Sequence, residues 1–292
     1  MNNLSTALIA LIVAVLAAYG TIKMTDGKST APVLAKKETA YERVLRTGVL
    51  RCGWADYPPL VLTKDPNTGE LKGIAKDIVE TAAKGLSLKV EWTEEVGWGN
   101  WQEGLKSGRY DAFCATLWPM AAMGREVRYT IPIYYNPIYG YARADDTRFD
   151  NGLAAANDPS IRISGQDGEI SQLVASAHFP KATYVAIPQL AELMLIFVNV
   201  GQNKADLVFN APDVVGGYTD KNPGVLKRVT PEPFQFFSTA IGVAMNEVNL
   251  EHMLSTAFTE MHNNGTMEMI LDAHKAPKDQ FMRVAKPYQP AQ

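Results

Sequence analysis

The sequence of 292 residues has few of the residue types that mark several large classes of protein. It contains only two cysteines, so it is not a small secreted fold that depends on a network of disulfides. Its four histidines do not show the spacing of a metal-binding motif. The catalytic patterns G-x-S-x-G and H-E-x-x-H, the Walker A motif and the dinucleotide-binding glycine pattern are all missing. We therefore expect no metal centre and no bound cofactor.

An excess of positive charge is also missing. Lys and Arg total 28 against 31 Asp and Glu, which gives a net charge of −3. A chain with this balance has no basic surface to neutralise phosphates, so we expect no nucleic-acid partner. Hydrophobic residues make up 47% and charged residues 20%. These values are ordinary for a globular protein and exclude a disordered, collagen-like or polytopic membrane protein as the overall class.

One long apolar run is present, at the N-terminus. Residues 4–22 contain no charged residue and precede the first lysine, Lys23. About 20 apolar residues are needed to span a bilayer, so the run is of borderline length. Two interpretations of residues 1–24 remain open, a cleaved secretory signal and an uncleaved membrane anchor. Residues 25–40 are small and polar and contain a proline, which is typical of a linker.

The rest of the chain alternates strand-like and helix-like segments. Strands are expected over residues 49–54, 88–93 and 110–115, and helices over 41–48, 73–84 and 101–107. A second set of alternating segments begins after Tyr141, and a final helical region covers residues 250–274 with a break at Gly265. Such alternation predicts βαβ units, an α/β fold and mainly parallel sheets.

A series of short motifs gives a more specific indication. They are a glycine-bounded strand at 48–53, a Pro-Pro-Leu loop at 58–60, a Gly-x-x-x-Asp helix start at 73–77, a Leu-x-x-Gly-x-x-Asp-Ala strand at 105–112, and a Tyr-Thr-Ile-Pro segment with a second tyrosine at 129–134. In order and spacing they resemble the family 3 extracellular solute-binding proteins, over roughly residues 41–274. Most members of that family are amino-acid receptors of ABC importers.

The resemblance implies a two-lobed periplasmic-binding-protein fold of type II (Venus flytrap) with two crossover strands. Lobe 1 would comprise residues 41–141 plus 238–276, lobe 2 would comprise 142–237, and 277–292 would be a polar tail. A small-molecule solute would bind between the lobes, which would close by a hinge motion. The implied partner is an ABC permease in the inner membrane. We expect a periplasmic monomer that contacts the membrane only through residues 4–22.

The predicted binding residues of lobe 1 depart from the family pattern. Thr116 and Trp118 occupy the segment that carries the family's ligand contacts. The arginine that would bind a ligand α-carboxylate falls on Met123, and Arg125 lies two residues later. Arg125 is either a displaced ligand contact or an ordinary surface arginine. Without such an arginine a bound carboxylate would lack a partner, which is energetically costly.

Lobe 2 departs from the pattern as well. Its glycine turn reads Gly-Gln-Asp-Gly-Glu and ends in Glu169, which either begins a helix or faces the ligand. The family's amine-binding aspartate falls on Ala211, and Asn210 and Asp213 flank that position. The amine contact, like the carboxylate contact, is therefore not where the resemblance would place it.

Aromatic residues near the expected cleft suggest a ligand class. Trp54 and Tyr57 follow the first strand, and Trp118 replaces a small polar residue. Aromatic faces stack on flat ligands or hold cations. With acidic residues nearby, this favours a cationic or aromatic solute, although an amino acid is the family default. The candidate binding residues are Trp54, Tyr57, Thr116, Trp118, Arg125, Glu169, Asn210 and Asp213.

The activity and the state of the cysteines complete the expectations. We expect a binding protein and not an enzyme, with a periplasmic dehydratase of the same fold or a membrane-tethered ligand sensor as alternatives. Cys52 and Cys114 lie on strands that the family fold places side by side. They are either a disulfide or two buried thiols, and we favour the thiols. The sequence does not determine the identity of the solute.

Overall fold

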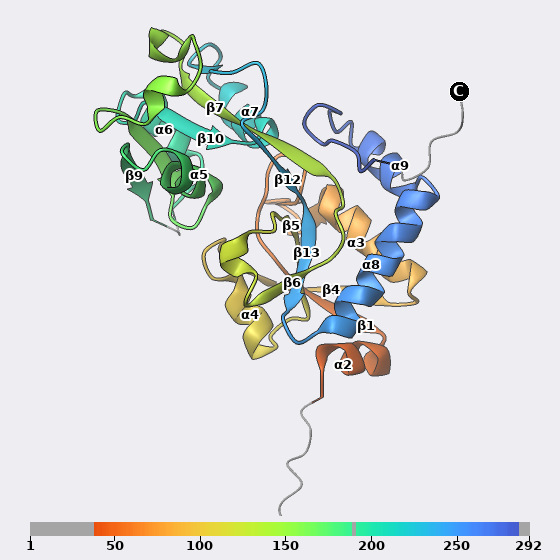
Figure 1. Ribbon diagram of the computed structural model, residues 1–292. Helices are drawn as coiled ribbons and strands as arrows, with labels where there is room; N and C mark the ends of the chain where they lie inside the picture. Colours follow the sequence, from red (N-terminus) through yellow and green to blue (C-terminus); the bar gives the residue numbers. More distant parts are fainter. Residues whose placement is uncertain (1–37, 189–190, 286–292) are drawn as a thin grey trace, which may run out of the picture. The chain divides into compact units, whose positions relative to one another are not determined.

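A computed structural model describes residues 38–188 and 191–285 (Figure 1). The chain divides into two units, Met1–Glu38 and Thr39–Gln292, and the second is described below. The expected signal or anchor, residues 1–24, lies outside the described residues, as does nearly all of the expected linker. Among the residues that are described, no helix has the length and apolar character needed to cross a membrane.

Five strands form the first sheet, in the order β4-β1-β5-β13-β6. Its strands are β1 (Val49–Trp54), β4 (Lys89–Glu95), β5 (Ala112–Leu117), β6 (Val127–Tyr129) and β13 (Ala240–Ala244). Strand β1 is parallel to β4 and β5, whereas β13 runs antiparallel to β5 and β6. Strands β2 (Thr63–Lys64) and β3 (Leu71–Lys72) pair separately. We call the part of the chain built on the five-stranded sheet the first lobe.

Helices cover both faces of the first sheet. They are α2 (Ala40–Thr47), α3 (Ile74–Gly85), α4 (Trp101–Ser107), α8 (Val248–Asn263) and α9 (Thr266–Ala273), with a short 3₁₀ turn η1 (Ala121–Met123). Figure 1 shows α4 on the other side of the strands from α3 and α8. The apolar face of α3 is buried through Ile74, Ile78 and Val79, as its helical spacing predicts.

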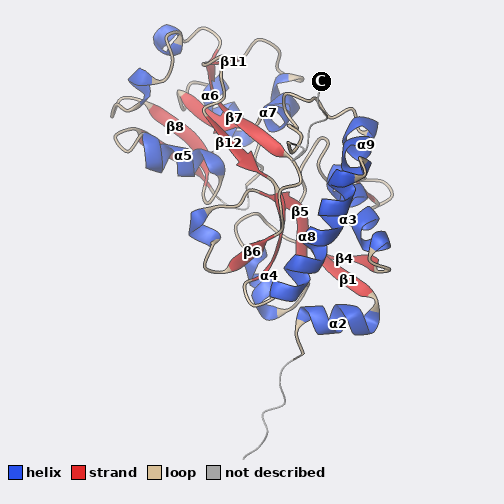
Figure 2. Cartoon of the chain, turned by 45° about the vertical axis from the view of Figure 1, so that its right-hand side comes forward, coloured by secondary structure: helices blue, strands red, loops and turns tan. Residues whose placement is uncertain are grey.

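The second sheet has the order β11-β7-β10-β8-β9, and β12 pairs with β7 beside it. Its strands are β7 (Tyr135–Arg143), β8 (Arg162–Gln166), β9 (Thr183–Ile187), β10 (Leu207–Asn210), β11 (Leu226–Arg228) and β12 (Gln235–Ser238). The helices are α5 (Ile170–His178), α6 (Leu195–Gly201) and α7 (Pro212–Thr219), with 3₁₀ turns η2 (Thr147–Phe149) and η3 (Ala154–Ala156). We call this part the second lobe (Figure 2).

Two long connections join the sheets. Strand β7 takes the chain into the second sheet, and β12, antiparallel to β7, leads directly back to β13 of the first sheet. The expected boundaries at Tyr141 and Phe237 fall inside β7 and β12. The prediction of mainly parallel sheets is wrong, because these returning strands pair antiparallel with the parallel βαβ strands and make both sheets mixed.

Local signals in the sequence define several helix ends. Thr39 begins α2 with a capping box, in which its hydroxyl accepts from the Glu42 N–H and its own N–H donates to the Glu42 carboxylate. Gly265 separates α8 from α9 with a φ of 80°, a left-handed conformation that glycine adopts without strain. The predicted break at Gly265 is therefore confirmed.

The two cysteines form a disulfide, so the expectation of two buried thiols is corrected. In the register of the neighbouring parallel strands, Cys52 of β1 lies opposite Ala112 of β5, two residues before Cys114. The Cα atoms of the two cysteines are 5.6 Å apart and both residues are fully buried. This separation is within the range that a disulfide requires.

The described part of the expected polar tail packs against β7. Phe281 is fully buried and its ring lies 5.2 Å from that of Tyr134. Met282 pairs with Tyr135 in an antiparallel bridge, and the Asn136 amide donates to the Gln280 carbonyl at 3.0 Å. The segment thus contributes an apolar anchor at the strand that connects the two sheets.

Candidate functional site

Asp213 is a buried carboxylate without a partner. It follows Pro212, which begins α7 at a position that suits proline. The residue is 4% exposed, and neither Oδ1 nor Oδ2 has a hydrogen-bond partner among the described residues. Burial raises the pKa of Asp213 to about 6, and the nearby N–H groups of Asp213 and Val214 offset only part of that effect. An ionised carboxylate in such a place is costly unless a cation joins it.

Glu169 is a second acid of the same lobe, and it has partners. It is the N-cap of α5, where its Oε2 accepts from the Ser171 N–H at 2.9 Å. Its Oε1 accepts from the Asn210 amide at 2.7 Å. Burial raises the pKa of Glu169 to about 8, and these hydrogen bonds only partly counteract it. The helix-start interpretation of Glu169 is thereby confirmed, and its carboxyl group keeps a proton near neutral pH.

Tyr57 connects these acids to the first lobe. It lies in the loop between β1 and β2 and is 8% exposed. Burial raises the pKa of its hydroxyl well above the ordinary value, and the charges of Asp213, Tyr134 and Glu169 raise it further. Such charge effects act across several ångströms, so Tyr57 shares an electrostatic environment with both acids of the second lobe.

Two further tyrosines complete the group. Tyr134 and Tyr141 are buried, and burial is the main cause of their raised pKa values. The charge of Asp213 adds to the rise in both. We call Asp213, Glu169, Tyr57, Tyr134 and Tyr141 the Asp213 cluster. Its members come from the loop between β1 and β2, from Tyr134 and β7, and from the first residues of α5 and α7, and α7 packs against β7.

Thr116 and Asn210 each form a hydrogen bond with a member of the cluster. The hydroxyl of Thr116 lies 3.1 Å from the Tyr134 hydroxyl, and both side chains are buried. Asn210 is buried. Its amide N–H donates to Glu169, and its side-chain oxygen accepts from the Ala211 N–H at 2.9 Å. Both predicted residues therefore orient cluster members.

The two predicted tryptophans lie at different places. Trp118 stacks on Phe237 with ring centroids 5.5 Å apart, and its indole N–H donates to Asn136 at 3.1 Å. Because Asn136 belongs to β7 and Phe237 to β12, Trp118 packs where the chain crosses between sheets. Trp54 is 4% exposed, and the Lys64 ammonium lies 5.8 Å from the centre of its ring. No described contact joins Trp54 to the Asp213 cluster.

Arg125 is separate from the cluster. It is exposed in the turn between η1 and β6, and no described residue forms an ion pair or hydrogen bond with it. The Arg228 guanidinium lies 4.4 Å from the centre of the Tyr139 ring. Its charge lowers the pKa of Tyr141, whereas no described Lys or Arg has a comparable effect on Tyr57, Tyr134 or Asp213.

The sequence pointed to Asp213, Glu169 and Tyr57 but not to Tyr134 and Tyr141. Tyr134 ends the 129–134 motif and Tyr141 lies at the expected lobe boundary, so the sequence marked their positions but did not predict a role in binding. Alternation along β7 is a usable signal, because Tyr139 and Tyr141 are two residues apart and lie on one face of the strand. Their rings are 6.5 Å apart.

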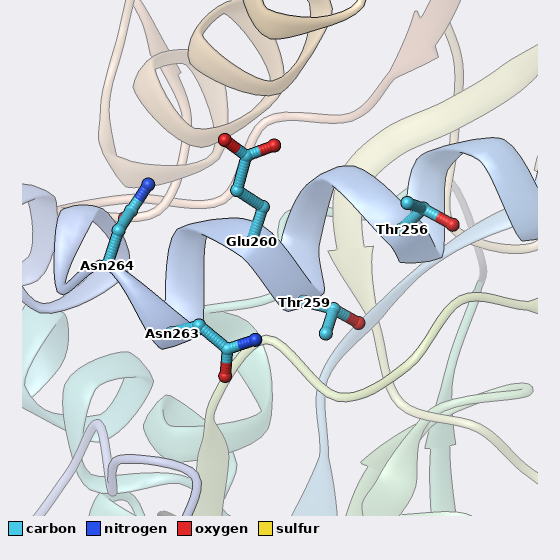
Figure 3. Close-up of a pocket in the computed structure, with 5 residues that line it drawn as sticks. All are labelled: Thr256, Thr259, Glu260, Asn263 and Asn264. Atoms are coloured by element: carbon cyan, nitrogen blue, oxygen red, sulfur yellow. The ribbon is translucent and has the colours of Figure 1, made fainter.

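Two surface pockets lie elsewhere. One is on α8, lined by Thr256, Thr259, Glu260, Asn263 and Asn264. Figure 3 shows Glu260 and Asn264 on one side of the helix and Thr259 and Asn263 on the other. All five lining residues are exposed, so this pocket, built on one helix, has no buried polar group to select a ligand.

The second pocket lies over an ion-pair network in the second lobe. Its lining residues are Arg143, Asp145, Asp146, Thr147, Arg148, Ser160, Arg162, Asn203 and Asp206. Acidic and basic side chains are already paired there, as in the Arg162–Asp206 pair at 2.9 Å. No residue of the Asp213 cluster lines either pocket, and the described chain contains no group of three or more side chains suited to hold a metal ion.

Comparison with solved structures identifies the fold. The ancestral amino acid-binding protein AncCDT-1, described as a precursor of cyclohexadienyl dehydratase, is 20% identical with a TM-score of 0.68, over 81% of this chain and 99% of the other. A mutant of the arginine-binding protein of T. maritima is 15% identical with a TM-score of 0.66, over 82% and 100%. An amino acid ABC transporter substrate-binding protein of Streptococcus pneumoniae, bound to L-arginine, is 19% identical with a TM-score of 0.66, over 85% and 100%.

These likenesses confirm the predicted two-lobed fold of type II periplasmic binding proteins. A comparison with curated protein sequences found no significant match. Residues 50–275, more than three quarters of the sequence, match the family described as bacterial extracellular solute-binding proteins, family 3. Together with the two mixed sheets and their paired crossover strands, this match shows that the chain belongs to the bacterial extracellular solute-binding proteins, family 3.

Proposed function

We propose that this protein is the solute receptor of an ABC-type importer and captures a small organic molecule at the Asp213 cluster. The buried, unpartnered carboxylate of Asp213 carries this proposal. A residue that costs folding free energy in the ligand-free protein is explained when a ligand supplies its missing partner. Solved structures with the same fold include an ancestral arginine-binding protein bound to arginine and bound to glutamine.

The cluster has the composition of a site between two moving lobes. Tyr57 comes from the first lobe, whereas Asp213 and Glu169 come from the first turns of helices in the second. We propose that lobes divided near Tyr141 and Phe237 separate and close around the solute, with Trp118 and Phe237 packing at the hinge. The receptor would act as a periplasmic monomer, delivered by residues 1–24 as a signal or held by them as an anchor.

A thermal-shift screen of the purified protein tests the proposed function. The panel holds amino acids, amines, polyamines, carboxylic acids and aromatic acids. A ligand at 100 times its dissociation constant adds about 2.7 kcal/mol to the free energy of unfolding. We expect a clear rise in Tm with at least one class and its loss in a variant of the cluster, Tyr57→Ala. A rise that Tyr57→Ala leaves unchanged would place the binding site elsewhere.

Catalysis by dehydration is the second candidate, and Glu169 favours it. Because its pKa is raised to about 8, this carboxyl group holds a proton at neutral pH and is able to donate it to a leaving hydroxyl. Among the described residues, however, no arginine acts on Asp213 or Tyr57, and Arg228, which acts on Tyr141, lies over the Tyr139 ring. Incubation with a cyclohexadienyl acid, followed by ultraviolet absorbance of an aromatic product, decides this point. We expect no product above the uncatalysed rate.

A further inference from the structure

We infer that the ligand of this receptor is an organic amine that lacks an α-carboxylate, with its ammonium group held by Asp213 among the rings of Tyr57, Tyr134 and Tyr141. This inference rests on the proposed function and names the chemical class of the solute. It differs from the family default, which is an amino acid.

The need for a cation comes from Asp213 itself. Its carboxylate is more than nine-tenths buried, and neither oxygen accepts a hydrogen bond from a described residue. The first-turn N–H groups of α7 are close enough to lower its pKa but do not make hydrogen bonds of ordinary geometry. A ligand ammonium has three N–H donors and a positive charge, so it supplies both of the missing interactions.

Three buried tyrosines on which the charge of Asp213 acts suit the same group. Tyr57, Tyr134 and Tyr141 are all buried, and the charge of Asp213 acts on the hydroxyl group of each. Aromatic faces attract a desolvated ammonium through their quadrupole, and phenolic oxygens accept its remaining N–H bonds. Tyr134 is held in position by Thr116 and by the ring of Phe281, so this part of the site is rigid.

A ligand carboxylate finds no cation beside Asp213, because the Arg228 guanidinium, which acts on Tyr141, lies over the Tyr139 ring and does not act on Asp213. No described Lys or Arg influences the pKa of Asp213, Tyr57 or Tyr134, and Arg125 is exposed in the turn between η1 and β6. Glu169 begins α5 and directs its own carboxyl group at the first N–H groups of that helix, a position that a ligand anion would otherwise use. The anion-binding position at the N-terminus of α5 is therefore already filled by Glu169. The charge of Asp213 would also repel a ligand carboxylate.

The charge of the cluster at neutral pH agrees with a single ammonium. With a pKa near 6 Asp213 is mostly ionised at pH 7, whereas Glu169 with a pKa near 8 is mostly protonated. The cluster thus carries about one negative charge. Arg228 lies over the Tyr139 ring, and its charge influences Tyr141 but not Asp213.

Matched pairs of ligands that differ only in the carboxylate test the inference. Isothermal titration calorimetry at pH 7 compares tyramine with tyrosine, cadaverine with lysine, and agmatine with arginine. We expect at least one amine to bind at least about tenfold more tightly than its amino acid. Equal or tighter binding of the amino acid in every pair would overturn the inference while leaving the proposed receptor function standing. Failure of all three amines to bind would also overturn the inference. The thermal-shift screen with the wider panel would then test the receptor function separately.

Two variants of α7 show whether Asp213 holds the amine. Asp213→Asn keeps the size of the side chain and removes its charge, so the amine should bind at least about tenfold more weakly. Asp220→Asn is the matched control, because Asp220 caps the other end of the same helix and is exposed. It should bind the amine as the wild type does. Unchanged binding by Asp213→Asn, with the variant shown to be folded by its thermal transition, would overturn the assignment.

Discussion

Asp111 of the first lobe and Asp206 of the second accept the same set of hydrogen bonds. Asp111 lies directly before β5 and accepts from the backbone N–H of Arg51 at 2.7 Å and from its guanidinium at 3.0 Å. Asp206 lies directly before β10 and accepts from the backbone N–H of Arg162 at 2.8 Å and from its guanidinium at 3.0 Å.

The correspondence extends to the next shell of groups. The Arg51 guanidinium also donates to the Gly108 carbonyl, and that of Arg162 donates to the Asn203 carbonyl, both at 2.9 Å. Each aspartate pairs with a second arginine as well, Arg43 in the first lobe and Arg148 in the second. The two lobes therefore share a structural device, a buried aspartate that ties two parallel strands together, although no repeat is visible in the sequence.

Removal of either aspartate should destabilise its lobe strongly. Asp206→Asn removes an anion that three guanidinium groups share. Arg143 and Arg148 keep their pairs with Asp146, and the arginines are partly exposed, so the expected cost is about 1.5–3 kcal/mol. Asp111→Asn should have an effect of similar size. Urea denaturation monitored by circular dichroism measures both, with the exposed Asp220→Asn as a control that should stay within about 0.5 kcal/mol of the wild type. A loss below 1 kcal/mol would show that the network contributes little.

Asp213→Asn should have the opposite effect on the ligand-free protein. Burial raises the pKa of Asp213 from 3.8 to about 6, so its charge opposes folding at neutral pH. Replacing it with a neutral amide should increase the free energy of unfolding by about 1–3 kcal/mol. Denaturation of the two proteins side by side at pH 7.5 provides the measurement. A less stable variant would mean that Asp213 has a structural partner and is not held ready for a ligand.

The stability of the ligand-free protein should fall as pH rises from about 5 to 8. The carboxyl groups of Glu169 and Asp213 have folded-state pKa values of about 8 and about 6, above their ordinary values of 4.5 and 3.8. The folded protein therefore binds more protons than the unfolded chain between these values, and each proton lost with rising pH favours unfolding. The groups that face Glu169 are Asn210, Tyr57 and Tyr184, none of which is positively charged.

The Tm measured across this range tests the prediction, and Glu169→Gln is the variant that should flatten the slope above pH 6. Asp206 behaves in the opposite way. Burial raises its pKa but the hydrogen bonds from Arg162 and Arg148 outweigh that effect, so the net pKa lies below the ordinary value. The ionised Asp206 therefore contributes to folding stability above about pH 4, and this contribution is lost as the pH falls further. A Tm that rises steadily from pH 5 to 8 would contradict the assigned burial of Glu169.

The disulfide should be present in the exported protein and should stabilise it. Cys52 and Cys114 are separated by 62 residues. Closing a loop of that length lowers the entropy of the unfolded chain, which stabilises the folded protein by about 4 kcal/mol. The double variant Cys52→Ala/Cys114→Ala should unfold at a correspondingly lower urea concentration. Thiol labelling under denaturing conditions without reductant should modify neither cysteine, and labelling of both would restore the interpretation as thiols.

Much of the fold follows from patterns that the sequence displays directly. The amphipathic spacing in 73–84 gives α3, and Gly265 separates α8 from α9, because these signals act within a few residues. The mixed character of the sheets does not follow. It depends on β7, β12 and β13 returning across long stretches of chain, and strand direction in such a return has no local signal.

The site was predictable in residue type but not in detail. Asp213 was a candidate because it flanks Ala211, yet its missing partner is a property of burial and becomes visible only in the structure. Trp118 was expected to line the cleft, and in the structure its ring packs on Phe237, since the crossing strand β12 brings a second ring to it. Tyr141 came to the cluster through the register of β7, which local propensity does not define.

A crystal structure of the protein with bound cadaverine or tyramine tests the role of Asp213 most directly. The quantity to measure is the distance between the ligand nitrogen and the nearer carboxylate oxygen of Asp213. The expected result is an ammonium about 2.7–3.0 Å from that oxygen, with the rings of Tyr57 and Tyr134 beside it. An amine bound away from Asp213, with the carboxylate still unpartnered, would contradict the assignment of this cluster as the ligand site.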